Sequence, residues 1–135
     1  FSNSGMDYLC LPSLREVSDK FLYTEEKIEE VYLPNLQIVG SHFMNWNKRI
    51  FELDLPNLIS VEACFLASND RIIDLNCPML KMVGHNFFGT NTTLSHFYAP
   101  NLETAGEYAF YHNNYIRNII LEQIAHKEKV KVKII

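Results

Sequence analysis

The chain has few of the features that mark an enzyme, a membrane protein or a disulfide-rich domain. It has no run of about 18 apolar residues, so no transmembrane helix is expected, and no basic-then-apolar leader. Its three cysteines, Cys10, Cys64 and Cys77, form no C-x-x-C pair, so they predict neither a zinc site nor a disulfide framework. A compact D-x-D-x-D-G loop for calcium is also missing. The sequence therefore predicts no metal and no cofactor.

An excess of positive charge is missing as well. The chain has 12 basic and 16 acidic side chains and a net charge of −4. This balance argues against nucleic acid as a partner and against binding to anionic membranes. At 135 residues, with 47% hydrophobic and 21% charged residues, the composition is that of one ordinary globular domain.

The chain does contain a strongly regular internal repeat, which has to be interpreted before any other feature. All five prolines are spaced 22 residues apart, at Pro12, Pro34, Pro56, Pro78 and Pro100. A core of repeating apolar positions accompanies them, with a leucine two residues after every proline. The sequence therefore predicts a coil in which each 22-residue turn covers the next.

Each turn begins with a short strand. Val31-x-Leu33 and Leu53-x-Leu55 have the spacing of two side chains on one face of an extended strand. The proline that follows ends the strand, because it has no N–H to donate to a sheet. We expect equivalent strands to pair in parallel. We also expect one phenylalanine per turn, as in Phe43, Phe65 and Phe87, to lie in the core.

Asparagines and glycines recur at two bends of the repeat. Asn47, Asn69, Asn91 and Asn113 lie 13 residues after the prolines and are predicted to face inward and bond the backbone of their own and adjacent turns. Surface asparagines in turns are the alternative. Glycines occur six residues after a proline at 40, 84 and 106, but Ser18 and Glu62 also occupy this position, which indicates close approach of neighbouring turns rather than a required positive φ.

The repeat defines the expected domain organisation. Residues 1–124 form the solenoid, with an irregular first turn over residues 1–30, and about six rungs are expected. Residues 125–135 contain an alternating Lys-Val pattern and are predicted to be a C-terminal cap strand or a transition to a further domain. Because the pattern is already under way at the first residues, we expect the chain to be a fragment of a larger protein.

The unit I-x-x-L-x-L-P-N-L-x-x-V-G-x-x-x-F-x-x-x-N resembles the leucine-rich repeat superfamily, and within it the BspA-like type. The resemblance covers residues from about Asn3 to Ile124, although the BspA-like unit is one residue longer and often has cysteine in place of asparagine. It implies an α/β-class leucine-rich-repeat solenoid that is mainly β, with a parallel sheet on the concave face and an irregular or 3₁₀ convex side. It also implies binding of macromolecules, at a microbial surface or in a host-directed effector, and it implies no catalytic residues.

Candidate functional residues are those whose side chains alternate with the buried ones along each strand and therefore face outward. Glutamates and aspartates align on successive strands and tyrosines flank them, which favours binding of a protein partner with a basic segment. A solvated polar face is the alternative. The predicted binding residues are Glu30, Tyr32, Glu52, Asp54, Asp74, Asn76, His96 and Tyr98.

Other arrangements indicate little chemistry. His42 and Cys64 share one repeat position, as do Asp74 and His96, but neither pair has the third group that nucleophilic catalysis requires. Trp46, the only tryptophan, is either a contact residue or packed, and Asn91-Thr92-Thr93 fits a glycosylation sequon.

The sequence thus favours a non-enzymatic protein-recognition domain. A structural spacer or substrate-recruitment arm of a larger enzyme is the first alternative, and a hydrolase or metal-dependent enzyme is the second. No compartment and no oligomeric state are indicated.

Overall fold

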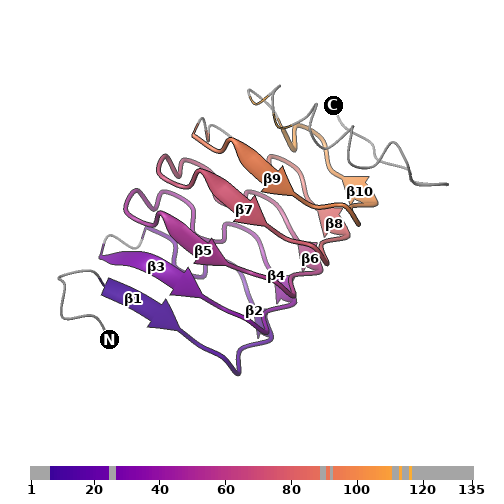
Figure 1. Ribbon diagram of the computed structural model, residues 1–135. Helices are drawn as coiled ribbons and strands as arrows, with labels where there is room; N and C mark the ends of the chain where they lie inside the picture. The colour runs from indigo at the N-terminus through magenta and orange to yellow at the C-terminus, as the bar shows by residue number, and fades with distance from the viewer. Residues whose placement is uncertain are drawn as a thin grey trace.

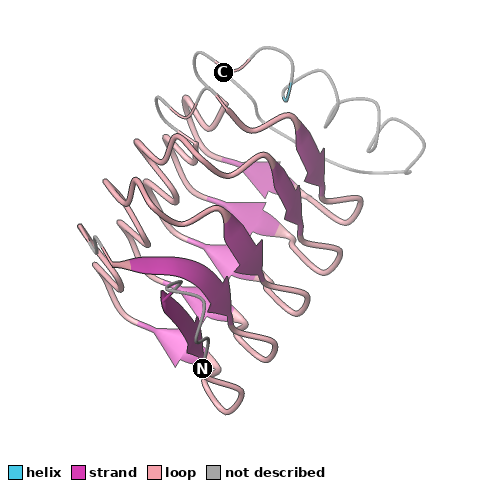
Figure 2. Ribbon diagram, turned by 60° about the vertical axis from the view of Figure 1, so that its left-hand side comes forward, coloured by secondary structure: helices cyan, strands magenta, loops and turns pink. Residues whose placement is uncertain are grey.

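Over the residues that the structure describes, the protein is a parallel β-solenoid with almost no helix (Figure 1). The computed structural model describes residues 7–24, 27–88, 91, 93–110, 113 and 116. Within them there are ten strands, two for each winding of the chain, one in each of two sheets. The chain makes about four turns between the first two strands and the last two. In Figures 1 and 2 the turns step along a nearly straight line, so the marked concavity expected of the first sheet is not seen.

The first strand of each turn lies where the sequence predicted it, just before the proline. These strands form what we call the first sheet, and the outward side of this sheet is the first face. The register places equivalent residues of successive turns opposite one another, as in Val31 with Leu53 and Leu75 with Phe97. The strands are β1 (Asp7–Cys10), β3 (Ile28–Tyr32), β5 (Glu52–Asp54), β7 (Asp74–Asn76) and β9 (His96–Tyr98).

A second parallel sheet lies on the return path, where the sequence predicted irregular or 3₁₀ structure. Its two-residue strands all pair with their neighbours, and none of the described residues is in a 3₁₀ helix. That expectation came from the family resemblance and was wrong for this segment. The sequence pattern could not correct it, because each of these strands buries at most one side chain, such as Val39 or Val61, and one residue cannot display a period of two. The strands are β2 (Glu16–Val17), β4 (Ile38–Val39), β6 (Ser60–Val61), β8 (Met82–Val83) and β10 (Thr104–Ala105).

The first sheet, unlike the second, is divided. β1, β3 and β5 form one ladder and β7 and β9 form another, while β5 and β7 lie next to each other without joining a single ladder. The second sheet runs unbroken from β2 to β10 and holds the two halves together. The solenoid therefore remains one stack despite the seam in the first face.

The core consists of the predicted apolar positions, stacked from turn to turn. The rings of Phe43, Phe65 and Phe87 stack nearly parallel, with centroids 5.1 and 4.9 Å apart, and all three are fully buried. Cys77 replaces a leucine of this core and is buried. Burial raises the pKa of its thiol far above the usual range, and nearby Asp54 raises it further, so the thiol stays protonated and unreactive.

The inward asparagines form the predicted ladder. Asn47, Asn69, Asn91 and Asn113 are all buried, and each side-chain oxygen accepts backbone N–H groups two or three residues later. The amide of Asn69 also donates to the carbonyl of Ile50 in the preceding turn, at 3.4 Å. Because Asn91 is only 1% exposed, the sequon that it begins is inaccessible in the folded protein.

The third side of each turn connects the second sheet back to the first (Figure 2). In the three turns that follow Pro12, Pro34 and Pro56, every second residue here has a positive φ, at positions eight, ten and twelve residues after the proline, although none is glycine. In the next two turns Asn86 and Tyr108 have a positive φ at the first of these positions. His42, Met44 and Trp46 are examples, with φ of 61, 52 and 59°. The alternation directs successive backbone groups to neighbouring turns, since the Met44 amide donates to Phe21 and the Trp46 amide donates to Ala67.

The glycines at 84 and 106 are explained by close approach, as predicted. Neither has a positive φ, yet a Cβ on Gly84 would lie 2.6 Å from the carbonyl carbon of Glu62 and 2.8 Å from the amide of Ala63. These atoms belong to the backbone of the preceding turn, so they cannot move aside without disturbing the ladder of β6 and β8.

We expect Gly84→Ala to lower the free energy of unfolding by about 1–3 kcal/mol, the usual cost of overpacking. The measurement is the shift of the urea midpoint at constant m-value. Glu62→Ala, at the same repeat position one turn earlier, is the matched control and should stay within about 0.5 kcal/mol of the wild type. Equal effects of the two changes would show that the close approach does not determine which residue fits here.

Two expectations concern segments beyond the described residues. The sixth rung, near residues 119–124, and the predicted cap or transition at 125–135 both lie outside them, so neither is tested. Within the described part of the chain, no helix has the length and apolar character needed to cross a membrane.

Candidate functional site

The first face carries all eight residues that the sequence predicted for binding. The register aligns Tyr8, Glu30 and Glu52 in one row and Asp74 with His96 in its continuation beyond the seam. A second row pairs Cys10 with Tyr32 and Tyr32 with Asp54, and continues as Asn76 with Tyr98. Adjacent strands of a sheet lie about 4.8 Å apart, so each row is a line of closely spaced side chains.

At the N-terminal end of this face, Tyr32 holds its neighbours in place. Its hydroxyl donates to Oε2 of Glu30 at 3.0 Å, and both side chains are half-buried. The ring of Tyr8 meets the ring of Tyr32 edge to face, with centroids 6.0 Å apart. The carboxylate of Glu30 therefore has a hydrogen-bond partner within the face.

At the other end, Asp74 is paired in a similar way. Oδ1 of Asp74 lies 2.7 Å from Nδ1 of His96, and both side chains are largely exposed. The pair that the sequence placed at one repeat position is thus in contact. No further polar side chain is bonded to it among the described residues, so it has the form of an isolated surface contact rather than a catalytic dyad.

The centre of the first face carries the carboxylates that remain uncompensated. Glu52 and Asp54 are both exposed and extend from β5, two residues apart on the same side of the strand. Within the described residues, neither carboxylate makes a hydrogen bond or an ion pair, and the first face has no lysine or arginine among its eight candidate residues. The face is therefore acidic at its centre and has a tyrosine on each side.

The field of these carboxylates acts on Tyr32. Partial burial raises the pKa of its hydroxyl above the usual value of 10.0, and the hydrogen bond to Glu30 raises it further. The charges of Glu30, Glu52 and Asp54 add to the shift in the same direction. Because the folded form holds this proton more tightly, its contribution to stability is complete below the unfolded pKa and is lost as the pH rises through the folded pKa.

We expect Glu30→Gln to lower the pKa of Tyr32 toward 10, and Glu52→Gln to lower it by a smaller amount, because Glu52 acts through its charge alone. The ultraviolet absorbance of tyrosinate, followed against pH and corrected with Tyr32→Phe, measures this shift. Glu103→Gln removes an exposed carboxylate elsewhere and should leave the titration unchanged. A Tyr32 pKa unaffected by Glu30→Gln would contradict the hydrogen bond.

The other predicted pair, His42 and Cys64, lies along a small cavity of about 390 Å³ on the third side. No hydrogen bond joins the two side chains in the described part of the chain. Nδ1 of His42 lies 3.0 Å from the side-chain nitrogen Nδ2 of Asn45. The side-chain amide of Asn86 donates weakly to Sγ of Cys64, at 3.8 Å. These contacts give no base, orienting group and nucleophile in series.

Metal ligation finds no support in the geometry. Across the residues that the structure describes, no three side chains of the types His, Cys, Asp or Glu are grouped so that they could hold a metal ion. The aligned carboxylates of Glu30, Glu52 and Asp74 thus form a row and do not converge on one point.

Comparisons with known proteins complete the description of the site. The chain matches no protein-family model, no curated protein and no solved structure. The function of the chain is therefore inferred from its own geometry and charge.

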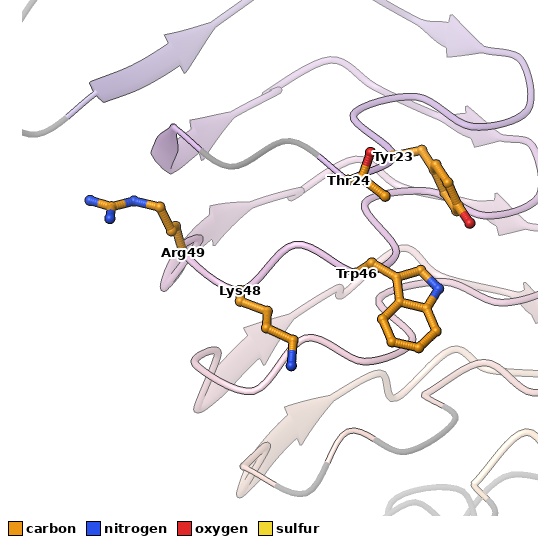
Figure 3. A pocket seen from close by; sticks show the side chains of 5 residues that line it. All are labelled: Tyr23, Thr24, Trp46, Lys48 and Arg49. Carbon is orange, nitrogen blue, oxygen red and sulfur yellow. The ribbon is translucent and has the colours of Figure 1, made fainter.

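Sequence reasoning missed a second candidate surface, on the third side. A shallow cavity of about 610 Å³ is lined by Tyr23, Thr24, Trp46, Lys48 and Arg49 (Figure 3). Trp46 is 54% exposed and Tyr23 is 40% exposed. Of the two alternatives given for Trp46, a contact residue or a packed one, the structure therefore excludes the packed one. A signal was present in the repeat, because Thr24 and Ser68 occupy the position of Trp46 in the adjacent turns.

Proposed function

We propose that this chain is a non-enzymatic recognition domain whose first face binds a basic segment of another protein. The observation that carries the proposal is the pair of uncompensated carboxylates, Glu52 and Asp54, at the centre of that face. Partner cations placed there gain attraction without first displacing an internal ion pair. Tyr32 and Tyr98 lie in the same row on either side and supply the aromatic anchors that concentrate binding energy at interfaces.

The internal pairs of this face fit the same function. The carboxylates of Glu30 and Asp74 already contact Tyr32 and His96. The attraction for a partner's cations is therefore strongest over β5. Like charges about 4.8 Å apart repel by roughly 1–3 kcal/mol for effective dielectric constants between 80 and 20. A basic partner relieves this repulsion, so the binding of such a segment and the relief of strain within the face are coupled.

As to family, we propose a BspA-like leucine-rich repeat with about six rungs, acting at a microbial surface or as a host-directed effector. The 22-residue period, the leucine two residues after each proline and the parallel first sheet support this assignment. The unbroken second sheet and the alternating positive φ on the third side are departures from the expected irregular return path.

The test is binding of a fluorescent octalysine peptide at low ionic strength. We expect Glu52→Lys to weaken binding about tenfold, which corresponds to 1.4 kcal/mol, and added salt to weaken binding to the wild type. Glu103→Lys makes the same change in net charge at an exposed site away from the first face, and it should weaken binding less than about twofold, a difference under 0.5 kcal/mol.

The two variants separate the possible outcomes. Selective loss in Glu52→Lys supports recognition through the first face. Equal loss in both variants would mean that only net charge matters, and absence of binding in the wild type would favour the alternative role of a spacer or recruitment arm. Turnover of a substrate that is abolished by Cys64→Ala would instead favour an enzyme.

A further inference from the structure

The cavity of about 610 Å³ that Tyr23, Trp46 and Lys48 help to line has no role in the function proposed above. We propose that it binds an acidic sugar unit of a glycan. In this arrangement the sugar ring stacks on Trp46 and Tyr23, and its acidic group faces the ammonium of Lys48. The proposal concerns a different surface and a different class of ligand from the binding of a basic segment by the first face.

Trp46 is not explained by the requirements of the fold. More than half of its side chain is exposed, and threonine and serine serve at the same repeat position in the adjacent turns. Its φ of 59° is one that bulky L-residues rarely adopt, so a large ring adds nothing favourable to this backbone conformation. A tryptophan kept exposed at a strained position indicates a role in binding.

Tyr23 shows the same departure from the repeat. Asn45 and Ala67 occupy its position in the next two turns, whereas Tyr23 presents a ring that is 40% exposed. In Figure 3 the side chains of Tyr23 and Trp46 extend from successive turns toward the same side of the cavity. Nζ of Lys20 lies 5.9 Å from the centre of the Tyr23 ring, which places a second cation beside the aromatic pair.

The cations of the cavity differ in their availability. Arg49 is paired with Glu29, and Figure 3 shows its guanidinium directed away from Trp46. Nζ of Lys48 is 4.0 Å from Asp70, with both side chains more than half exposed, so this pair is weak and Lys48 can turn to a bound anion. Of the two described cations that line the cavity, Lys48 is therefore the one available to an anion. Glu25 and Glu26, which follow Thr24 in the sequence, lie outside the described residues.

The shape of the site favours a sugar over a flat apolar ligand. Its volume of about 610 Å³ is within the range of small-ligand sites, but it is open to solvent and combines aromatic surfaces with the Thr24 hydroxyl and Lys48. An apolar ligand would keep much of its surface in water here. A pyranose ring has an apolar C–H face for the aromatic rings and hydroxyl groups that remain hydrated at the rim.

The test uses a trimer of α-1,4-linked galacturonic acid and, as the matched neutral ligand, its methyl ester. Trp46 is the only tryptophan, so its fluorescence reports directly on occupation of the site. We expect the acid to change this emission and to bind at least tenfold more tightly than the ester. By calorimetry, Trp46→Ala should weaken binding of the acid at least tenfold, and Lys48→Gln should remove most of the preference for the acid.

Tyr108→Ala is the control variant, because Tyr108 is another exposed aromatic residue with positive φ but does not line the cavity. It should bind the acid as the wild type does. Three results would overturn the proposal: no binding of the acid at millimolar concentration, equal binding of acid and ester, or an equal fluorescence change with hexaglutamate. The last result would show that any polyanion, including an acidic protein segment, satisfies the site.

Discussion

Phe65→Ala should lower the free energy of unfolding by about 3–5 kcal/mol, the range observed when a buried ring is deleted. Phe65 is fully buried in the middle of the phenylalanine stack, with Phe43 on one side and Phe87 on the other. The substitution removes two stacked ring pairs, each worth about 0.5–1.5 kcal/mol beyond the buried area. It also leaves a cavity that the unbroken ladder of the second sheet prevents from collapsing.

Urea unfolding followed by circular dichroism measures this effect. Tyr98→Ala removes a ring of similar size that is 51% exposed on the first face, and it should change stability by no more than about 0.5 kcal/mol. A loss below about half a kilocalorie per mole for Phe65→Ala would show that the ring is not part of a packed core.

The features that could be predicted are those that the repeat expresses in apolar side chains. From the second turn on, the first strand and the residue that follows it contribute two buried side chains at a spacing of two, such as Val31 and Leu33, and a proline comes next. The phenylalanine stack and the inward asparagines followed from their recurrence alone. Placing the eight residues of the first face then required only the alternation of side chains along a strand.

The features that could not be predicted depend on backbone geometry or on contacts between turns. A strand such as β4, with one buried residue, has no periodic signature, and nothing in the sequence marks a positive φ at His42 or Met44. The exposed asparagines after the prolines also had an unrecognised role. Asn35 and Asn57 each donate to the proline carbonyl of the preceding turn, at 2.6 Å, and their recurrence in the motif was the available signal.

The seam between β5 and β7 is the least expected feature, and it lies beside the acidic centre of the first face. Glu52 lies on β5 beside the seam, and among the described residues its carboxylate has no partner, whereas that of Asp74 contacts His96. Repulsion alone does not explain the seam, since Glu30 and Glu52 are paired across an intact ladder. The interruption of the first sheet therefore lies beside the two uncompensated carboxylates of β5.

The second large effect is expected from the asparagine ladder. At the bend, the side chain of Asn69 supplies hydrogen-bond partners to backbone groups that would otherwise have none. Its side-chain oxygen accepts the amides of Arg71 and Ile72, each at 3.1 Å, and its amide donates to Ile50 at 3.4 Å. Asn69→Ala removes these partners in a buried site where water cannot replace them. Orphaned polar groups cost about 1–3 kcal/mol each, so we expect a loss of about 2–5 kcal/mol in the free energy of unfolding.

Asn57→Ala is the matched control for this substitution, because Asn57 makes one exposed hydrogen bond to the preceding turn. It should cost about 0.5–1.5 kcal/mol, the net value of an ordinary hydrogen bond. Urea midpoints of the two variants give the comparison, and hydrogen exchange of the Ile72 amide should accelerate in Asn69→Ala alone. If the two variants lose the same stability, the backbone at the bend does not depend on the buried asparagine, and adjacent turns are held by apolar packing and the two sheets.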